Sequence, residues 1–191
     1  MTNALVKRDT LLPVGVRSGR AERLRTGEAI SEFLVFTLGA ADSGRKERMG
    51  LPLESVQEIL KPTAVTHVPR APHDVVGILS VRGRITTVLD LRRRLSMSRE
   101  APTRHTRILL VKGREEVMGI VVDAVLHVVR LRDDEIEPAA VVGADLPEHV
   151  RGLGRPRRRD AVRGVVGQEA RGEASEAEVV VLLDPIALLK R

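Results

Sequence analysis

An internal repeat constrains this chain more than any other feature of its sequence. Residues 49–59 align with residues 118–128, an offset of 69 (118 − 49). The same offset relates Gly44 to Gly113, Pro69 to Pro138 and Val81-Arg82-Gly83 to Val150-Arg151-Gly152. Several matches at one offset indicate a duplication, and each copy alone is too small to bury much apolar surface. We therefore expect two small units of similar fold, packed together with a crease between them.

Short apolar runs, rich in Val, Ile and Leu, are separated by glycine, proline and charge. Runs of this length bounded by turn residues predict strands, and therefore an all-β fold with one small barrel per copy. The runs are FLVFTL (33–38), SVQEI (55–59), GILSV (77–81), ITTVLDL (85–91), RILLV (107–111), MGIVV (118–122), AVLHVV (124–129) and VVVLL (179–183).

Local signals predict two hairpin turns and one helix. The turns are Arg82-Gly83 and residues 112–115, where Gly83 and Gly113 are suited to a positive φ. At the C-terminus, Asp184 is a helix cap and Pro185 a first helical residue, which predicts a short helix through Leu189.

The repeat breaks once, near its end. Val88-Leu89-Asp90-Leu91 resembles Leu182-Leu183-Asp184-Pro185 at an offset of 94 (184 − 90), so the second copy carries about 25 extra residues (94 − 69). The insert spans about residues 155–178, with an arginine-rich block followed by a glutamate-rich one. We interpret it as a solvated surface loop or as a grafted docking loop. Residues 1–31 are polar and mixed in charge, and we expect a flexible N-terminal arm there.

Composition excludes several classes of protein. Among the 191 residues there is no cysteine, which excludes thiol catalysis, disulfides and cysteine-ligated metals. No apolar run approaches the roughly 18 residues of a membrane helix, and residues 1–16 lack the apolar core of a signal peptide, so we expect a cytoplasmic protein. The net charge of +6 leaves a basic nucleic-acid-binding barrel as the alternative, although Phe33 and Phe36 are the only aromatic residues and lie in an apolar run.

Motifs for catalysis are missing. The five histidines form no HxxxH or HExxH pattern, and neither GxSxG nor GxxxxGK[ST] occurs. Asp90 and Asp184 occupy matching positions of the repeat; they are either paired carboxylates for a hydrolase or one cap used twice, and we favour the cap. We therefore expect no enzyme, no metal and no cofactor.

Taken together, several segments resemble the CheW family, the coupling proteins of bacterial chemosensory arrays. The resemblance covers about residues 32–190. Its most specific part is residues 68–92, with P-x-A-P, V-x-G-I, R-G-x-I and V-L-D-L-R in order, and Gly119-Ile120-Val121-Val122-Asp123 adds to it. The other matching segments are FLVFTLG, SVQEI, VRGLG and VLLDPIALL.

The resemblance implies a CheW-like domain over residues 32–191, with two packed SH3-like five-stranded barrels. We place the first barrel at about 32–100 and the second at about 101–191. Family members are non-enzymatic. They bind the regulatory domain of a CheA-type histidine kinase, with contacts at barrel ends, and the cytoplasmic tip of methyl-accepting chemoreceptors, at the groove between barrels. The resemblance thus implies a cytoplasmic protein recruited to receptor arrays, with the membrane reached only through receptors and no nucleic acid bound.

By motif, the positions associated with partner binding are Val56, Glu58, Arg82 and Gly83. Glu58 and Arg82 are expected either to pair on one barrel face, or to leave the Arg82 fork for a receptor carboxylate. The plainer interpretations are an exposed ion pair and a turn glycine. Gly119 and Asp123 are expected to shape the second barrel. The chain departs from the family pattern at Ser80 and Met49, in the basic turn 42–48 and in the insert. These departures leave open that the protein is a specialised coupler for one non-flagellar or alternative pathway.

Overall fold

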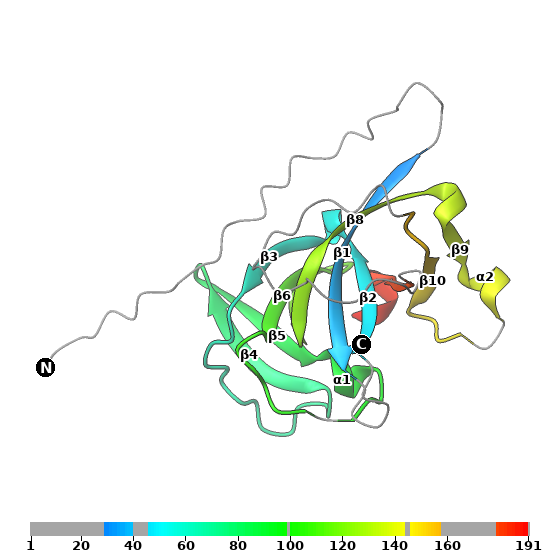
Figure 1. Ribbon diagram of the computed structural model, residues 1–191. Coiled ribbons are helices and arrows are strands. Elements are labelled where there is room, and N and C mark those ends of the chain that lie inside the picture. The colour runs from blue at the N-terminus through cyan, green and yellow to red at the C-terminus, as the bar shows by residue number, and fades with distance from the viewer. Residues whose placement is uncertain (1–28, 40–45, 99, 144–145, 158–178, 191) are drawn as a thin grey trace, which may run out of the picture.

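The computed structural model describes residues 29–39, 46–98, 100–143, 146–157 and 179–190, which are built mostly of strands (Figure 1). The strands are β1 (Ile30–Gly39), β2 (Lys46–Pro52), β3 (Val56–Leu60), β4 (Val75–Val81), β5 (Arg84–Asp90), β6 (Arg107–Lys112), β7 (Val117–Val122), β8 (Ala124–Arg132), β9 (Ile136–Pro138), β10 (Val150–Gly154) and β11 (Val180–Leu183). Short helical turns join some of them: η1 (Leu53–Ser55), α1 (Leu91–Arg94), η2 (Asp133–Glu135), α2 (Ala139–Val142) and α3 (Pro185–Leu188).

The strands form two sheets, which confirms the all-β prediction. Sheet A has the order β8-β1-β2-β11-β10-β9, and sheet B has the order β3-β6-β7-β5-β4. Most neighbours are antiparallel, but β11 runs parallel to β2 and β5 runs parallel to β7. Every apolar run predicted to be a strand overlaps one, although Ser55 lies in η1, Leu91 in α1 and Val179 before β11. Strands β2, β9 and β10 were not among the predicted runs.

The two sheets interleave along the chain, so the division into barrels at residue 100 is wrong. Sheet A combines β1 and β2 with β8–β11, and sheet B combines β3–β5 with β6 and β7. Each copy of the repeat thus contributes its first hairpin to the sheet completed by the other copy. The sequence does not reveal this exchange, because strands at equivalent positions of a duplication are chemically alike and pair equally well within a copy or between copies.

Two glycines show this equivalence in the structure. Gly50 of β2 lies opposite Leu182 of β11, and Gly119 of β7 lies opposite Val88 of β5. A Cβ on Gly50 would come within 3.0 Å of Val180 and 3.2 Å of Leu182, and one on Gly119 within 3.3 Å of Val88. Both parallel junctions therefore use a glycine where a Cβ would be crowded by the facing side chain.

The core has three parts. The largest lies between the sheets and includes Phe36 and Leu51 of sheet A, Leu109 and Ile120 of sheet B, and Leu188 of α3. A second cluster in sheet A surrounds Phe33, and a third in sheet B surrounds Val88. The exchanged hairpins contribute to both kinds of layer, since Phe36 and Leu109 lie in the shared core whereas Phe33 and Ile108 lie in the clusters of sheets A and B.

The predicted turns and caps are correct with one exception. In the β4–β5 turn, Arg82 has φ +48° and Gly83 has φ +81°, the left-handed geometry of a two-residue hairpin. Gly113 has no positive φ, because the longer loop of residues 113–116 closes through a hydrogen bond from Gly113 N to Glu116 O (2.9 Å) and needs no left-handed residue. Asp184 caps α3 through the N–H groups of Ile186 and Ala187, as predicted.

The N-terminal arm and the insert are only partly described. Strand β1 begins at Ile30, two residues inside the predicted arm, and residues 1–28 lie outside the described part. The first residues of the insert are bound to η2. Arg155 N donates to Glu135 O (2.8 Å), Arg157 N donates to Glu135 Oε1 (3.1 Å), and Arg157 Nη2 pairs with Asp134 Oδ2 (2.6 Å). Residues 158–178 of the insert lie outside the described part.

Candidate partner-binding site

Three of the four residues expected to bind partners lie together: Arg82 and Gly83 form the β4–β5 turn, and Glu58 of β3 contacts it. Arg82 Nη2 lies 3.2 Å from Glu58 Oε2, so the expected ion pair is present. The Arg82 side chain is 68% exposed and the Glu58 side chain only 7%. Gly83 follows Arg82 in the turn, and a Cβ built on it would meet nothing within 4 Å, so the turn projects into open space.

Val56, the fourth residue, does not reach this surface. Its side chain is fully buried in the core between the sheets. The β3–β6 pairing shifts register between Val56 and Glu58, and burial still alternates along β3, with Val56 and Glu58 buried and Gln57 exposed. Val56 is therefore suited to positioning Glu58 rather than to touching a partner.

The pair has an asymmetric electrostatic environment. Glu58 is a buried carboxylate whose charge needs compensation, and Arg82 supplies it from the protein surface. The exposed guanidinium carries five N–H donors in a planar fork, and one carboxylate does not use all of them. The arrangement thus presents a positioned cationic donor group at the end of sheet B.

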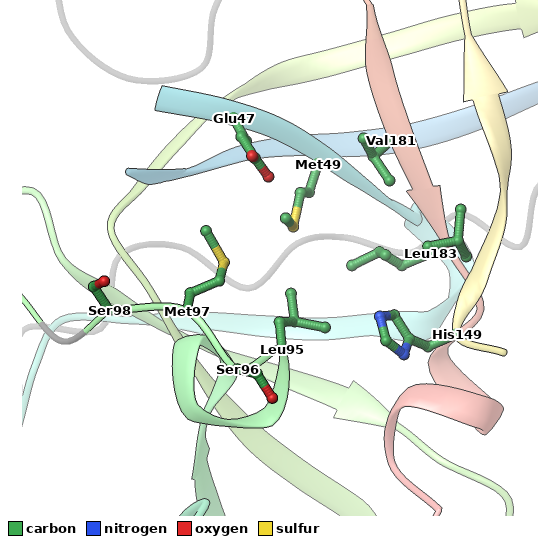
Figure 2. A pocket seen from close by; sticks show the side chains of 10 residues that line it. Glu47, Met49, Leu95, Ser96, Met97, Ser98, His149, Val181 and Leu183 are labelled. Carbon is green, nitrogen blue, oxygen red and sulfur yellow. The ribbon is translucent and has the colours of Figure 1, made fainter. Parts of the chain in front are cut away.

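A groove opens where sheet A meets the segment after α1 (Figure 2). Its volume is about 400 Å³, within the range of small binding pockets. Figure 2 shows Met49, Met97, Leu95 and Leu183 directed toward one another across the space, with Glu47 and His149 at its edges. Val150, Val181, Ser96 and Ser98 complete the lining. Methionine side chains adapt to the shape of an apolar partner, so the groove is suited to an apolar side chain or helix face.

His149 is the titratable group in this groove whose pKa departs clearly from its usual value. Burial lowers the pKa of His149, the Arg94 guanidinium lowers it further, and Glu148 opposes both. The imidazole is therefore held in its neutral form further into the acid range than an exposed histidine. A neutral ring suits the apolar lining.

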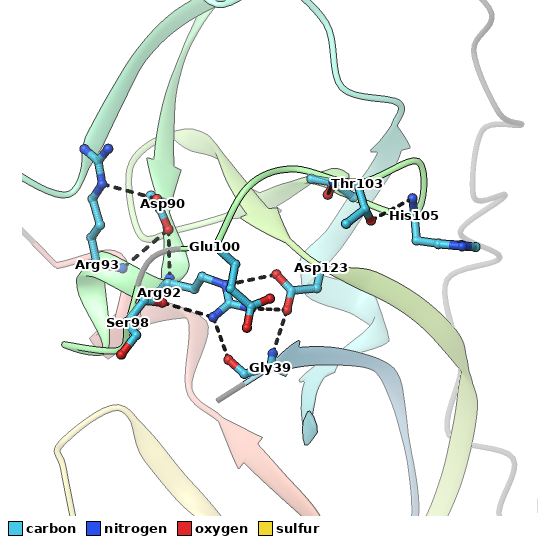
Figure 3. A network of polar contacts seen from close by, with 10 residues as sticks. Gly39, Asp90, Arg92, Arg93, Ser98, Glu100, Thr103, His105 and Asp123 are labelled. Carbon is cyan, nitrogen blue, oxygen red and sulfur yellow. Dashed lines mark hydrogen bonds and ion pairs between the residues drawn. The ribbon is translucent and has the colours of Figure 1, made fainter. Parts of the chain in front are cut away.

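A polar network joins the two sheets beside the groove (Figure 3). Arg92 of α1 is buried and donates to both carboxylate oxygens of Asp123, to Gly39 O (2.5 Å) and to Ser98 O (3.1 Å), and it also pairs with Glu100. Gly39 N in turn donates to Asp123 Oδ2 (2.6 Å). The network connects the end of β1 in sheet A with α1 and the β7–β8 junction, which supports the expectation that Asp123 shapes the fold.

The next two arginines make equally specific contacts. Arg94 Nε donates to Leu188 O (3.0 Å), Nη1 pairs with Asp74 (3.1 Å), and Nη2 donates to Lys190 O. Arg93 donates to His73 O (2.9 Å) and pairs with Asp90. The roles of Arg93 and Arg94 were not predicted, because most of their partners are 20 to 96 positions away in the chain. The one available signal was the run of three arginines after V-L-D-L.

The repeated aspartates act as helix caps. Asp90 accepts from the N–H groups of Arg92 and Arg93, as Asp184 does from those of Ile186 and Ala187. This confirms the interpretation of one cap used twice, and the hydrolase hypothesis loses its candidate residues. Within the described ranges, no group of three or more His, Cys, Asp or Glu residues is arranged to hold a metal ion.

The nucleic-acid alternative finds no support at the surface. Phe33 and Phe36 are both fully buried, so neither offers a face on which a base could stack. Several arginines are already engaged by carboxylates, including Arg92, Arg130 and Arg157. In the described part of the chain, no helix has the length and apolar character needed to cross a membrane.

Comparisons with known proteins agree with this geometry. Residues 32–191 match the family model of the CheW-like domain. The chain is 33% identical over 130 residues to the chemotaxis protein CheW of Klebsiella aerogenes, which covers 67% of this chain and 75% of that protein. It is 33% identical over 122 residues to protein FrzA of Myxococcus xanthus, which covers 64% of this chain and 72% of that protein.

A solved structure has the same fold. The scaffolding protein TtCheW from Thermoanaerobacter tengcongensis superposes with a TM-score of 0.64 at 23% identity, covering 84% of this chain and 93% of that chain. This likeness confirms the predicted fold of two SH3-like barrels. The chain therefore belongs to the CheW family of chemotaxis scaffold proteins.

Proposed function

We propose that this protein is a non-enzymatic coupler that joins the cytoplasmic tip of methyl-accepting chemoreceptors to the regulatory domain of a CheA-type histidine kinase. It would act in the cytoplasm, at receptor arrays, and meet the membrane only through the receptors. The observation that carries the proposal is the exposed Arg82 fork, held at the end of sheet B by the buried carboxylate of Glu58.

The hairpin tip is the candidate kinase contact. Family resemblance associates barrel ends with the kinase, and Glu58, Arg82 and Gly83 lie at such an end. An arginine that is prepositioned by a buried partner loses less side-chain entropy on binding than a free one. Val56 supports the site from beneath, since its burial fixes the strand that presents Glu58.

The groove beside His149 is the candidate receptor contact. The receptor tip is a helical hairpin, and an amphipathic helix binds by laying its apolar face into an apolar groove. Leu95 and Met97, which are partly exposed, supply such a surface, and the buried Met49 and Leu183 lie beneath them. The groove and the hairpin tip share no lining residue, so contact at one site does not use the residues of the other.

Coupling requires that the two sites communicate or that the protein binds signalling states unequally. A coupler with equal affinity for the kinase-on and kinase-off states shifts no population. The Arg92–Asp123 network and the contacts of Arg94 join α1 to both sheets and to α3. A displacement of α1 beside the groove would therefore be transmitted to both sheets. This supports signal transmission through the body of the protein rather than through a loose linker.

Co-sedimentation with receptor cytoplasmic fragments and full-length kinase is the decisive experiment. We expect the wild-type chain to enter the complex with both partners and Arg82→Ala to reduce its incorporation about tenfold while the fold is retained. Arg114→Ala is the matched control, since Arg114 is an exposed arginine on the β6–β7 hairpin. A wild-type chain that binds neither partner would refute the proposal.

A further inference from the structure

The hairpin tip extends beyond the Arg82–Glu58 pair. Ile85, two residues after the turn, is 76% exposed, although isoleucine is among the residues most often buried. Arg84 is also exposed, and it forms no ion pair with any residue that the structure describes. The tip therefore carries an apolar side chain and a second guanidinium that no contact in the fold explains.

The charges at the tip do not balance. Arg82 and Arg84 contribute two positive charges, and Glu58 offsets one of them. The tip therefore carries an exposed positive charge and an exposed isoleucine, an apolar side chain that is more often buried. Complementarity then favours a partner surface that combines a carboxylate with an apolar recess.

The shape of the tip limits the partner further. Val81 faces Arg84 and Ser80 faces Ile85 across the hairpin, and neighbours on a strand point to opposite faces. Arg84 and Ile85 thus lie on opposite faces of a turn that projects into open space. Only a concave surface touches both faces at once, whereas a rod-shaped helical hairpin suits the groove better.

We propose that Arg84 and Ile85 form, with Arg82, a protruding recognition tip that enters an acidic, apolar-lined recess on the kinase regulatory domain. The inference rests on the proposed function and adds the residues and the chemistry of the contact. Arg84 provides attraction over distance and so governs the association rate, while Ile85 provides the buried apolar contact and so governs dissociation.

Surface plasmon resonance of the full chain against purified kinase, and separately against a receptor cytoplasmic fragment, tests the tip. We expect Arg84→Glu to lower kinase affinity about tenfold or more, through a slower association whose salt dependence is reduced. Ile85→Ser is expected to lower it by about fivefold or more through faster dissociation. Neither change alters receptor affinity.

Matched controls separate the site from general effects. Arg114→Glu makes the same charge change on another exposed hairpin, and Val141→Ser removes an apolar side chain that is also 76% exposed. Both controls retain wild-type kinase affinity, and thermal unfolding followed by circular dichroism verifies the fold of all four variants. Arg84→Gln replaces Arg84→Glu if charge reversal disturbs folding.

The possible failures are distinguishable. Wild-type binding to kinase with unchanged affinity in both tip variants overturns the tip but leaves the proposed function intact. Loss of receptor binding in place of kinase binding overturns the assignment of the tip to the kinase. Absence of any binding by the wild-type chain overturns the proposed function and the tip together.

Discussion

The guanidinium of Arg92 and the carboxylate of Asp123 form a two-pronged ion pair that ties the two sheets together (Figure 3). Arg92 Nε lies 3.0 Å from Asp123 Oδ1, and Nη2 donates to Oδ2. The Arg92 side chain is 5% exposed and that of Asp123 26%. Since Asp123 also accepts from Gly39 N, one carboxylate holds α1 and the end of β1 in place.

Removing this carboxylate is expected to cost substantial stability. Asp123→Ala leaves the buried Arg92 guanidinium without its main partner, and we expect the free energy of unfolding to fall by about 3 kcal/mol in urea denaturation. Glu32→Ala, which breaks the exposed pair with Arg130, is the control and should cost about 0–1 kcal/mol. Equal losses from the two substitutions would contradict the role of Asp123.

Three glycines provide a graded prediction about backbone geometry. Gly77 has φ +154°, and a Cβ there would lie 2.2 Å from Thr66 O. Gly83 has φ +81° with nothing within 4 Å, and Gly143 has an extended φ of 168° with nothing nearby. We expect alanine to lower the free energy of unfolding by at least about 2 kcal/mol at Gly77, by about 1 kcal/mol at Gly83 and by less than about 0.5 kcal/mol at Gly143.

Thermal unfolding and amide exchange measure this series. At Gly77 the side chain also displaces the bridge between Thr66 and Ile78, so exchange at both amides should accelerate in Gly77→Ala alone. A similar loss of stability in all three variants would show that crowding at Thr66 is not the cause.

His149 predicts a pH dependence of stability. Its pKa is lowered in the folded protein by burial and by Arg94, so the unfolded chain takes up a proton more readily as the pH falls. Its contribution to stability is therefore fully present above the ordinary histidine pKa of about 6.5, declines as the pH falls below that value, and is fully lost once the folded-state pKa has also been passed.

Two measurements check the His149 prediction. In NMR titration, the imidazole of His149 should titrate below the ordinary histidine pKa of about 6.5. The stability of His149→Gln should depend less on pH between neutral and mildly acidic conditions than that of the wild type, with Glu148→Gln lowering the His149 pKa further. A His149 pKa above about 6.5 would reject the assignment.

The duplicated cap predicts matched losses at equivalent positions. Asp90→Ala and Asp184→Ala each remove acceptors for two N–H groups, and each is expected to cost about 1 kcal/mol. Asn substitutions should restore most of that stability, because asparagine caps helices nearly as well as aspartate. Failure of Asp184→Asn to recover stability would mean that charge, rather than capping, explains the residue.

The sequence by itself determined the local structure of this protein. Short apolar runs identified the strands around FLVFTL, ITTVLDL and MGIVV, and turn and capping residues identified the Arg82-Gly83 turn and the caps at Asp90 and Asp184. Each of these features depends on residues within a few positions of one another. The repeat also indicated two similar units, and motif spacing indicated the family. Even the Glu58–Arg82 pair was among the expectations.

The tertiary structure alone decided which strands pair and what surrounds the sites. Exchange of hairpins between the copies was invisible, because Val88 and Leu182 are equivalent partners for Gly119 and Gly50. The burial of Val56, the anchoring by Arg92 and the groove between Met49, Met97 and His149 likewise join residues far apart in the chain. Such contacts depend on the packing of the whole molecule, and no local pattern of side chains encodes them.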